Sequence, residues 1–186
     1  MAPTQLLAAD LLRGRTIALA GDVRGPVVDL LGGLGARLVA LGAAVEDLGG
    51  AAWAAQHGPV HALVYDAEAG FAQGGADALR TAVDDGWSAI HAVATAALIP
   101  QQAPAAIVLL APRSSAGLHA SAARAALENT ARTLSIEWAR FAVTTSAVTP
   151  GASTSDAEIA TLVAFLVSPA GAYFSGCRFE LGAVDG

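Results

Sequence analysis

Short apolar runs alternate along this chain with longer stretches of helical periodicity. The short runs are bounded by Gly, Pro or charged residues, and we predict buried strands at 16–20, 37–41, 60–65, 106–111, 143–148 and 177–181. The longer stretches are rich in Ala and Leu and predict helices at 27–34, 76–99, 118–141 and 156–167. The pattern is least regular over 43–55, where we expect a short strand and a reduced helix.

The alternation of strands and helices fixes the expected fold class. Strands separated by helices are typical of βαβ crossovers, which give parallel sheets covered by helices on both faces. We therefore predict an α/β fold with a doubly wound parallel sheet, a Rossmann-like three-layer α/β/α sandwich. Because no repeat, linker or low-complexity segment interrupts the pattern, residues 1–186 are expected to form a single domain.

Composition narrows the classes of partner. Of all residues 54% are hydrophobic and only 14% are charged, which indicates either an apolar surface covered by another subunit or a bias toward alanine. A net charge of −6 without a basic run argues against nucleic acid and anionic membranes as partners. We expect no signal peptide in residues 1–15, no membrane span, and no internal disulfide from the single Cys177. These features predict a cytoplasmic protein.

The turn after the first predicted strand carries the first sign of a known family. Its Gly21 and Gly25 are spaced as in the TGxxxGxG turn of short-chain dehydrogenases/reductases, which it resembles. In that family the glycines let the backbone approach a cofactor diphosphate at a helix N-terminus. Here Val27 replaces the third glycine and Asp22 adds negative charge, whereas Arg24 stands where NADPH-preferring members often carry a basic residue. A plain tight turn is the competing interpretation.

Further segments resemble the same family, in the family's order. Tyr65 and Asp66 stand in place of two asparagines that brace sheet and cofactor, and Trp87 falls roughly at the active-site asparagine of the fourth helix. The resembling segments are 57–67, 94–100, 107–117, 124–127, 134–138, 143–151, 165–168, 174–176 and 184–186. The chain is thus identified as a degenerate and shortened member of the short-chain dehydrogenase/reductase family.

The resemblance also implies that the catalytic groups are lost. The family uses a Tyr-x-x-x-Lys dyad with a serine, and alignment places Ala120 at the tyrosine, Arg124 at the lysine and Ser114 at the serine. The chain contains no lysine at all. Alanine offers no proton, and the planar, strongly basic guanidinium is a poor substitute for the lysine. We expect Ser114 to be vestigial. His119 lies one residue before the tyrosine position, and because one step along a helix turns a side chain by about 100°, we expect it to point away from the former active site.

Besides the changed cofactor turn and the missing catalytic groups, the substrate lid is also shortened. Family members carry a long loop with helices after the Pro-Gly pair, but here 150–151 leads almost at once to a helix near Asp156. We expect Thr154 or Ser155 to cap that helix, with Glu158 completing a capping box. A shortened lid would leave a substrate exposed to water.

Two long helices correspond to the segments that the family uses for assembly as a four-helix bundle. Each has an apolar stripe at helical spacing, and the candidate interface residues on these stripes are Trp87, His91, Leu98, Leu127, Leu134 and Trp138. Burial in the chain's own core is the competing interpretation of every one of them.

Three functional hypotheses remain open at this point. The first is a catalytically inactive subunit that pairs with an active paralogue of the same family in a hetero-oligomer, with self-association also possible. The second is an NAD(P)H-dependent oxidoreductase that uses Arg24, Ser114 and His119, and the third is a non-catalytic dinucleotide sensor. The first expects no cofactor, and the other two expect NADPH or NADH. No metal is expected, because His57, His61 and His91 lack metal-ligand spacing.

Overall fold

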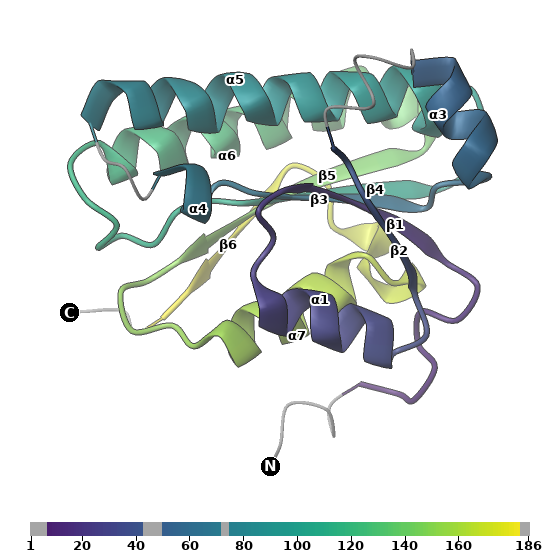
Figure 1. The fold of residues 1–186 in the computed structure, drawn as a ribbon, viewed down its shortest axis with the longest axis horizontal. Helices are drawn as coiled ribbons and strands as arrows, with labels where there is room; N and C mark the ends of the chain where they lie inside the picture. Colours follow the sequence, from purple (N-terminus) through teal and green to yellow (C-terminus); the bar gives the residue numbers. More distant parts are fainter. Residues whose placement is uncertain (1–6, 43–49, 72–74, 183–186) are drawn as a thin grey trace.

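The computed structural model describes residues 7–42, 50–71 and 75–182. These residues form a six-stranded, entirely parallel sheet in the order β2-β1-β3-β4-β5-β6 (Figure 1). The strands are β1 (Thr16–Gly21), β2 (Arg37–Ala40), β3 (Ala62–Asp66), β4 (Ala105–Leu110), β5 (Val143–Pro150) and β6 (Cys177–Leu181). The predicted α/β, Rossmann-like class is confirmed.

Helices cover both faces of the sheet (Figure 1). One face carries α3 (Gly50–His57), α5 (Gly75–Val93) and α6 (Ala120–Glu137), and the other carries α1 (Gly25–Gly33) and α7 (Asp156–Leu166). Shorter elements are α4 (Glu68–Phe71), the π-helix η2 (Ala94–Leu98) and the 3₁₀ helices η3 (Ala139–Phe141) and η4 (Pro169–Tyr173). The result is the expected three-layer sandwich.

Side chains alternate across the sheet and so divide the core in two. Along β3, Leu63 and Tyr65 join the cluster under α5 and α6, whereas Ala62 and Val64 join the cluster over α1 and α7. All four are buried. This period of two, applied to a strand buried on both faces, explains why β3 reads as an uninterrupted apolar run in the sequence.

The chain changes face between β1 and β3, and this places the candidate site. The helix that follows β1 is α1, on one face, and the long helix that follows β3 is α5, on the other (Figure 1). The loops that follow the carboxyl ends of these two neighbouring strands therefore lead to opposite faces of the sheet. In open α/β sheets such a switch point is where ligands bind.

The element boundaries differ from the sequence expectations at helix ends. The helix expected over 76–99 changes to a π-helical turn at Ala94, and the helix expected over 118–141 begins only at Ala120 and ends as a 3₁₀ turn. The short elements α4 and η4 were not anticipated. The strand expected near the start of 43–55 falls on residues outside the described ranges, and α3 provides the expected helix.

The start of α7 follows the predicted capping chemistry. The Ser155 hydroxyl accepts a hydrogen bond from the Glu158 amide, and the Glu158 carboxylate accepts one from the Ser155 amide at 2.8 Å. These backbone and hydroxyl donors lower the pKa of Glu158. Since the pKa of Glu158 is depressed in the folded chain, its hydrogen bonds add to the free energy of unfolding near neutral pH. This contribution is lost as the pH falls through the pKa of Glu158 in the folded chain. The β5–α7 connection is confined to residues 151–155.

Candidate functional site

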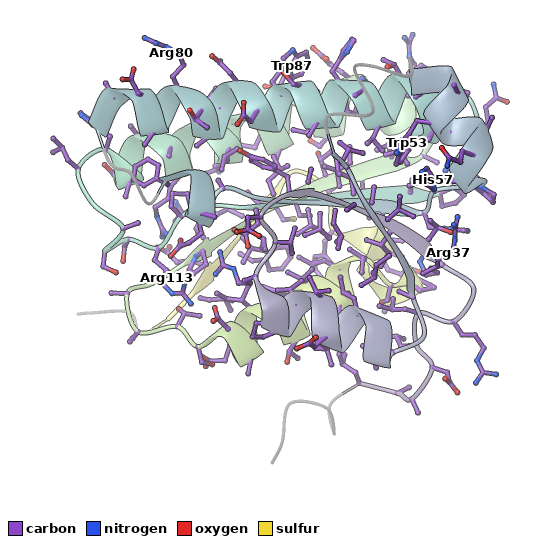
Figure 2. All side chains as sticks on the ribbon, viewed as in Figure 1. Arg37, Trp53, His57, Arg80, Trp87 and Arg113 are labelled. Carbon is purple, nitrogen blue, oxygen red and sulfur yellow. The ribbon has the colours of Figure 1, made fainter. Side chains whose placement is uncertain are left out.

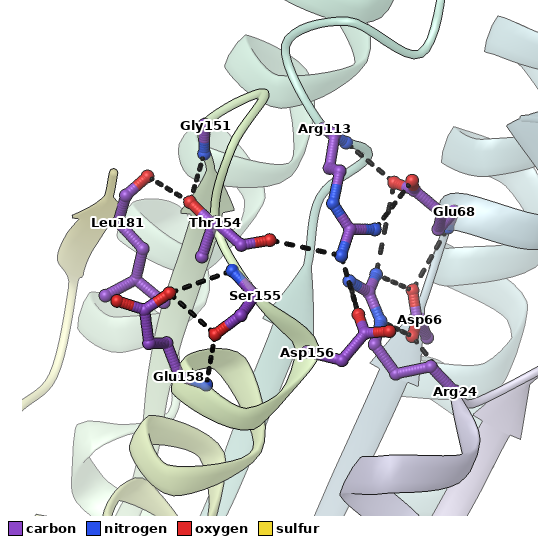
Figure 3. A network of polar contacts seen from close by, with 10 residues as sticks. All are labelled: Arg24, Asp66, Glu68, Arg113, Gly151, Thr154, Ser155, Asp156, Glu158 and Leu181. Carbon is purple, nitrogen blue, oxygen red and sulfur yellow. Dashed lines mark hydrogen bonds and ion pairs between the residues drawn. The ribbon is translucent and has the colours of Figure 1, made fainter. Parts of the chain in front are cut away.

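The switch point is filled by an arginine–aspartate pair (Figure 3). Arg24, in the loop between β1 and α1, donates from Nε to Asp66 Oδ2 at 2.7 Å and from Nη2 to Asp66 Oδ1 at 2.7 Å. The Asp66 side chain at the end of β3 is fully buried, and that of Arg24 is only 10% exposed. The geometry is the bidentate fork that an arginine forms with a carboxylate or a phosphate.

A second arginine extends the pair into a network that joins four segments of the chain. Arg113, after β4, donates from its amide to Glu68 Oε2 at 2.6 Å and from Nη1 to Glu68 Oε1 at 3.0 Å. Its Nη2 donates to Asp156 at the start of α7 at 2.6 Å and to the Thr154 carbonyl at 3.4 Å. Figure 3 shows both guanidinium groups enclosed by the three carboxylates of Asp66, Glu68 and Asp156.

The charges of this network are nearly balanced. Arg24 lies 3.6 Å from Asp156 through Nη1 and 4.0 Å from Glu68 through Nη2, which are Coulombic contacts rather than hydrogen bonds. Burial by itself lowers the pKa of Arg24, but the hydrogen bonds and charge of Asp66, with the charge of Glu68, outweigh burial and the pKa is raised. The same balance, with Asp156 and Glu68 as partners, raises the pKa of Arg113. Both arginines therefore stay charged and already have acidic partners.

These contacts occupy part of the donors that a diphosphate would need, whereas Arg24 Nη1 has no hydrogen-bond partner among the described residues. The Arg24 amide points to Asp66 Oδ2 at 3.3 Å, and the Val27 amide donates to the Arg24 carbonyl at 3.0 Å. The Val27 side chain is fully buried in the core over α1 and α7. An anion placed at this turn would also face the carboxylates of Asp66 and Glu68. The oxidoreductase hypothesis assigns Arg24 to a 2′-phosphate, but in the structure Nε and Nη2 of its guanidinium donate to Asp66.

The two glycines of the turn have different structural roles. Gly21 adopts a left-handed φ of 72°, and a Cβ added there would lie 2.3 Å from the Asp66 carbonyl oxygen. Glycine is thus required at this position by the approach of β3, independently of any cofactor. A Cβ added at Gly25 would meet nothing within 4 Å, and no packing argument requires glycine there.

Arg124 and Ser114 meet at the carboxyl end of β5. The Arg124 guanidinium donates to the carbonyl oxygens of Pro112, Pro150 and Thr149, and the Ser114 amide donates to the same Pro150 carbonyl at 3.3 Å. Burial lowers the pKa of Arg124, although Glu180, at 3.7 Å, opposes this. The arginine at the lysine position thus ties loops together through backbone carbonyls.

The alanine at the tyrosine position offers no acid. Ala120 is buried and is the first residue of α6. His119 precedes the helix in a left-handed conformation with φ 73°. The expectation that helical rotation turns His119 away is therefore wrong in its reason, because the residue is not on the helix. The Ser114 side chain is exposed, and its hydroxyl forms no hydrogen bond with the described residues.

Tyr65 fills the floor of the site against α5. Its hydroxyl donates to the Ala82 carbonyl at 2.9 Å, and burial raises the pKa of the phenol, with the charges of Asp85 and Asp66 acting in the same direction. The ring passes so close to Gly86 that a Cβ there would lie 2.8 Å from Tyr65 Cε1. The neighbouring Trp87, expected near the site, instead points away from the sheet (Figure 2).

We predict that Gly86→Ala costs about 1–3 kcal/mol of unfolding free energy, because the added methyl group overpacks the Tyr65 ring. Urea denaturation of the variant measures the cost, and Ser88→Ala, at an exposed position on the same helix, is the matched control. In the background of Tyr65→Ala the same substitution should become neutral or favourable, since alanine has the better helix propensity. Equal costs in the two backgrounds would contradict the packing argument.

A cavity of about 700 Å³ lies beside the network, over the carboxyl ends of β1 and β3. Small side chains of the strands and of α5 form much of its wall, and its polar lining includes Asp22, Thr81, Asp85 and Ser88. Asp22 and Asp85 are exposed carboxylates, so this side of the site is acidic. The cavity is large enough for a nucleoside-sized molecule, but its charge disfavours an anion.

The interface predictions need correction. Leu98 is fully buried, Leu127 and Leu134 are 2% exposed and Trp138 is 9% exposed, all within the cluster between the sheet and the long helices. These four side chains belong to the chain's own core, because an amphipathic stripe packs first against the sheet. Trp87 is 48% exposed and His91 is exposed. Sequence reasoning missed the exposed apolar residues Leu118, Ile136 and Tyr173.

Metal binding and membrane insertion find no support in the described part of the chain. Residues 7–42, 50–71 and 75–182 contain no cluster of three His, Cys, Asp or Glu side chains arranged to hold a metal ion. His61 accepts a hydrogen bond from the Thr16 amide at 3.0 Å, and the His57 ring lies 5.0 Å from the Trp53 ring, centroid to centroid, at an angle of 54°. Within the same ranges, every helix is too short or too polar to span a bilayer.

Comparison with known proteins finds likeness in structure only. No family model and no curated protein matches the sequence. A citronellol catabolism dehydrogenase (AtuB) of Pseudomonas aeruginosa superimposes with a TM-score of 0.75 at 24% identity, covering 95% of this chain and 96% of that one. A hydroxysteroid dehydrogenase of Escherichia coli gives a TM-score of 0.70 at 16% identity, covering 94% and 98%. BdcA of E. coli gives 0.63 at 19% identity, covering 92% and 100%. The chain therefore shares its fold with these three proteins, two of which are dehydrogenases.

Proposed function

We propose that this chain is a catalytically inactive subunit on a short-chain dehydrogenase/reductase scaffold, and that it assembles with an active oxidoreductase of the same fold. The observation that carries the proposal is the buried Arg24–Asp66 pair at the switch point, where this fold binds the diphosphate of a dinucleotide. The chain's own carboxylate stands in the place of the anion. No bound cofactor is then needed to hold the loops of the site in place.

The chemistry of the dyad positions supports the same proposal. A carbonyl reduction needs a proton donor near the hydride acceptor, and Ala120 supplies none. Arg124 is held by three backbone carbonyls and cannot act as a proton source, because its guanidinium stays charged. Tyr65 and Tyr173 are the chain's two tyrosines. The first is hydrogen-bonded to α5 and the second is 92% exposed on η4.

The outer surface of α5 supports the assembly part of the proposal. Trp87 is 48% exposed and lies 5.8 Å from the His91 ring, centroid to centroid. Figure 2 shows Trp87 projecting from α5 away from the sheet. Tryptophan is one of the residue types enriched among the side chains that dominate binding at protein interfaces. We infer that α5 packs against the corresponding helix of the active partner.

Calorimetric titration tests the loss of the cofactor site. With the purified chain, we expect no saturable heat from NADPH or NADH up to about 1 mM, because the diphosphate would have to displace a buried ion pair. An active short-chain dehydrogenase titrated under the same conditions is the positive control. Binding at micromolar strength would overturn the proposal that the site is closed.

Co-expression tests the partner. The chain, carrying an affinity tag, is expressed with an intact short-chain dehydrogenase from the same source, and the purified material is analysed by light scattering. We expect a stable hetero-oligomer. Trp87→Asp should raise its dissociation constant at least about tenfold, as expected for the loss of a buried aromatic anchor. Tyr173→Asp, at a still more exposed aromatic residue on η4, should leave assembly unchanged. A chain that forms only a homo-oligomer would contradict the hetero-oligomer.

The cavity of about 700 Å³ beside the network favours one second candidate, a sensor that binds without reacting. Its acidic lining by Asp22 and Asp85 suits an uncharged nucleoside rather than a dinucleotide. Titration with adenosine, set beside the NADPH titration, separates the two. Saturable binding of adenosine alone would favour the sensor, and no binding of either favours the inactive subunit.

A further inference from the structure

A second cavity lies at the opposite end of the sheet from the site described above. Its volume is about 570 Å³, and it is formed around the amino ends of β4 and β5, where Pro104 and Val143 lie in its wall. The end of α6 and the segment between α7 and β6 close its sides, the latter through Pro169 and Ala172. Most of the lining is apolar. The proposed inactive-subunit function makes no use of this cavity.

One charged group enters the lining. Arg15 immediately precedes β1, and it is the single charged side chain among the described residues that form the cavity wall. No described carboxylate forms an ion pair with it, whereas Arg24, Arg113 and Arg124 all have acidic partners.

The hydrogen bonds of Arg15 are also incomplete. Its Nε is buried and has no hydrogen-bond partner among the described residues, and its Nη2 reaches the His61 carbonyl only at 3.4 Å. Burial lowers the pKa of Arg15. The pKa of His61 is lowered first by the burial of its own side chain and second by the charge of Arg15. A partly buried guanidinium with unused donors is costly to the fold unless an anion neutralises it.

A hydroxyl donor completes the polar part of the wall. The Ser175 oxygen accepts a hydrogen bond from the Thr145 amide at 3.3 Å, and its own hydrogen has no acceptor among the described residues. In contrast, the Ser168 and Ser135 hydroxyls already donate to carbonyls of their own segments, at 2.7 Å in both cases. The cavity therefore presents the donors of Arg15 and Ser175 beside an apolar wall.

We propose that this cavity binds a small organic carboxylate, with the carboxylate paired to Arg15 and a short hydrocarbon or aromatic body against Val143, Pro169 and Ala172. A single guanidinium with an apolar wall suits a monoanion, because its planar fork matches a carboxylate and the wall excludes water from the rest of the molecule. A nucleotide would bring more charge than one arginine neutralises.

Benzoate is the probe that tests this site. Titration of the full chain, at constant ionic strength, is followed through the backbone amide resonances of Thr144, Ala172 and Ser175. We expect saturable shifts with a dissociation constant of about 1 mM or tighter, which is ordinary for a ligand of this size. Benzyl alcohol, which has the same ring without the charge, should bind at least about tenfold more weakly, because it cannot form the charge-assisted pair.

Two variants separate charge from shape. Arg15→Gln should weaken benzoate binding at least about tenfold, as expected when a charged hydrogen-bond partner is lost. Arg80→Gln, at an arginine whose side chain is 72% exposed on α5, should leave it unchanged. Ala172→Trp, at an exposed position in the wall, should block binding while keeping the charge, and it decides the question if Arg15→Gln fails to fold. Absence of saturable shifts in the unmodified chain, equal affinity for benzyl alcohol, or unchanged binding in Ala172→Trp would overturn the proposal.

Discussion

Asp66→Ala is expected to destabilise this chain by about 3–5 kcal/mol, the largest effect of any single substitution that we predict in the ion-pair network. The reason is that the change leaves Arg24 buried without its bidentate partner, and removing one member of a buried pair costs far more than the pair itself contributes. The Asp66 side chain is fully buried and the Arg24 side chain is 10% exposed, so water cannot readily replace the lost carboxylate. Chemical denaturation with urea measures the change.

A matched control and a double variant make this expectation specific. Asp85→Ala removes an exposed carboxylate from the neighbouring cavity wall and should change stability by no more than about 0.5 kcal/mol. Arg24→Leu in the Asp66→Ala background removes the orphaned charge and should recover much of the loss. If Asp66→Ala proves as mild as Asp85→Ala, the pair is not the element that holds the switch point together.

Gly21→Ala is the second substitution with a large expected effect. Its Cβ would lie 2.3 Å from the Asp66 carbonyl oxygen, and its φ of 72° is in the left-handed region. Backbone strain alone costs about 1–3 kcal/mol, and the overlap with β3 forces the strands apart in addition. We expect a total loss of about 3 kcal/mol or more, measured by thermal and urea denaturation.

Gly25→Ala is the control that gives this result its meaning. Both glycines match the cofactor turn, but a side chain at Gly25 meets nothing within 4 Å. Stability should stay the same or rise by up to about 1 kcal/mol, because alanine restricts the unfolded chain. The pattern of one required and one free glycine is what strand packing predicts. A comparable loss in both variants would indicate that the whole turn is held by something other than β3.

The fold could be predicted from the sequence because its signals are local. The burial of a strand or a helix can be predicted from residues that are close together in sequence. The apolar run that ends at Tyr65 and the helical stretch before Trp138 are examples. The Ser155–Glu158 capping box is equally local, and it was predicted correctly. Helix ends were less predictable: Ala94 begins a π-helical turn although its neighbours continue the same apolar stripe.

The ion-pair network could not be predicted, because its partners are distant in sequence. Arg24 and Asp66 are separated by 42 positions, and Arg113 and Asp156 by 43. No periodicity relates such residues; only the sheet order brings their loops together. An amphipathic stripe likewise shows that Leu127 and Leu134 are buried without showing what buries them. In the structure the sheet does so, and Trp87 stays exposed on α5.

The mutual enclosure of Arg24 and Asp66 also constrains how such a chain could evolve. A phosphate-binding turn here would require the carboxylate to be removed, but its loss alone leaves a buried guanidinium without its partner, and loss of the guanidinium alone leaves a buried carboxylate without its partner. Either first step lowers stability before any cofactor can compensate. The effects of substitutions at the two positions are therefore expected to be non-additive, with each single change costing more stability than the double change. Engineering a nucleotide site into this scaffold would have to replace both residues at once.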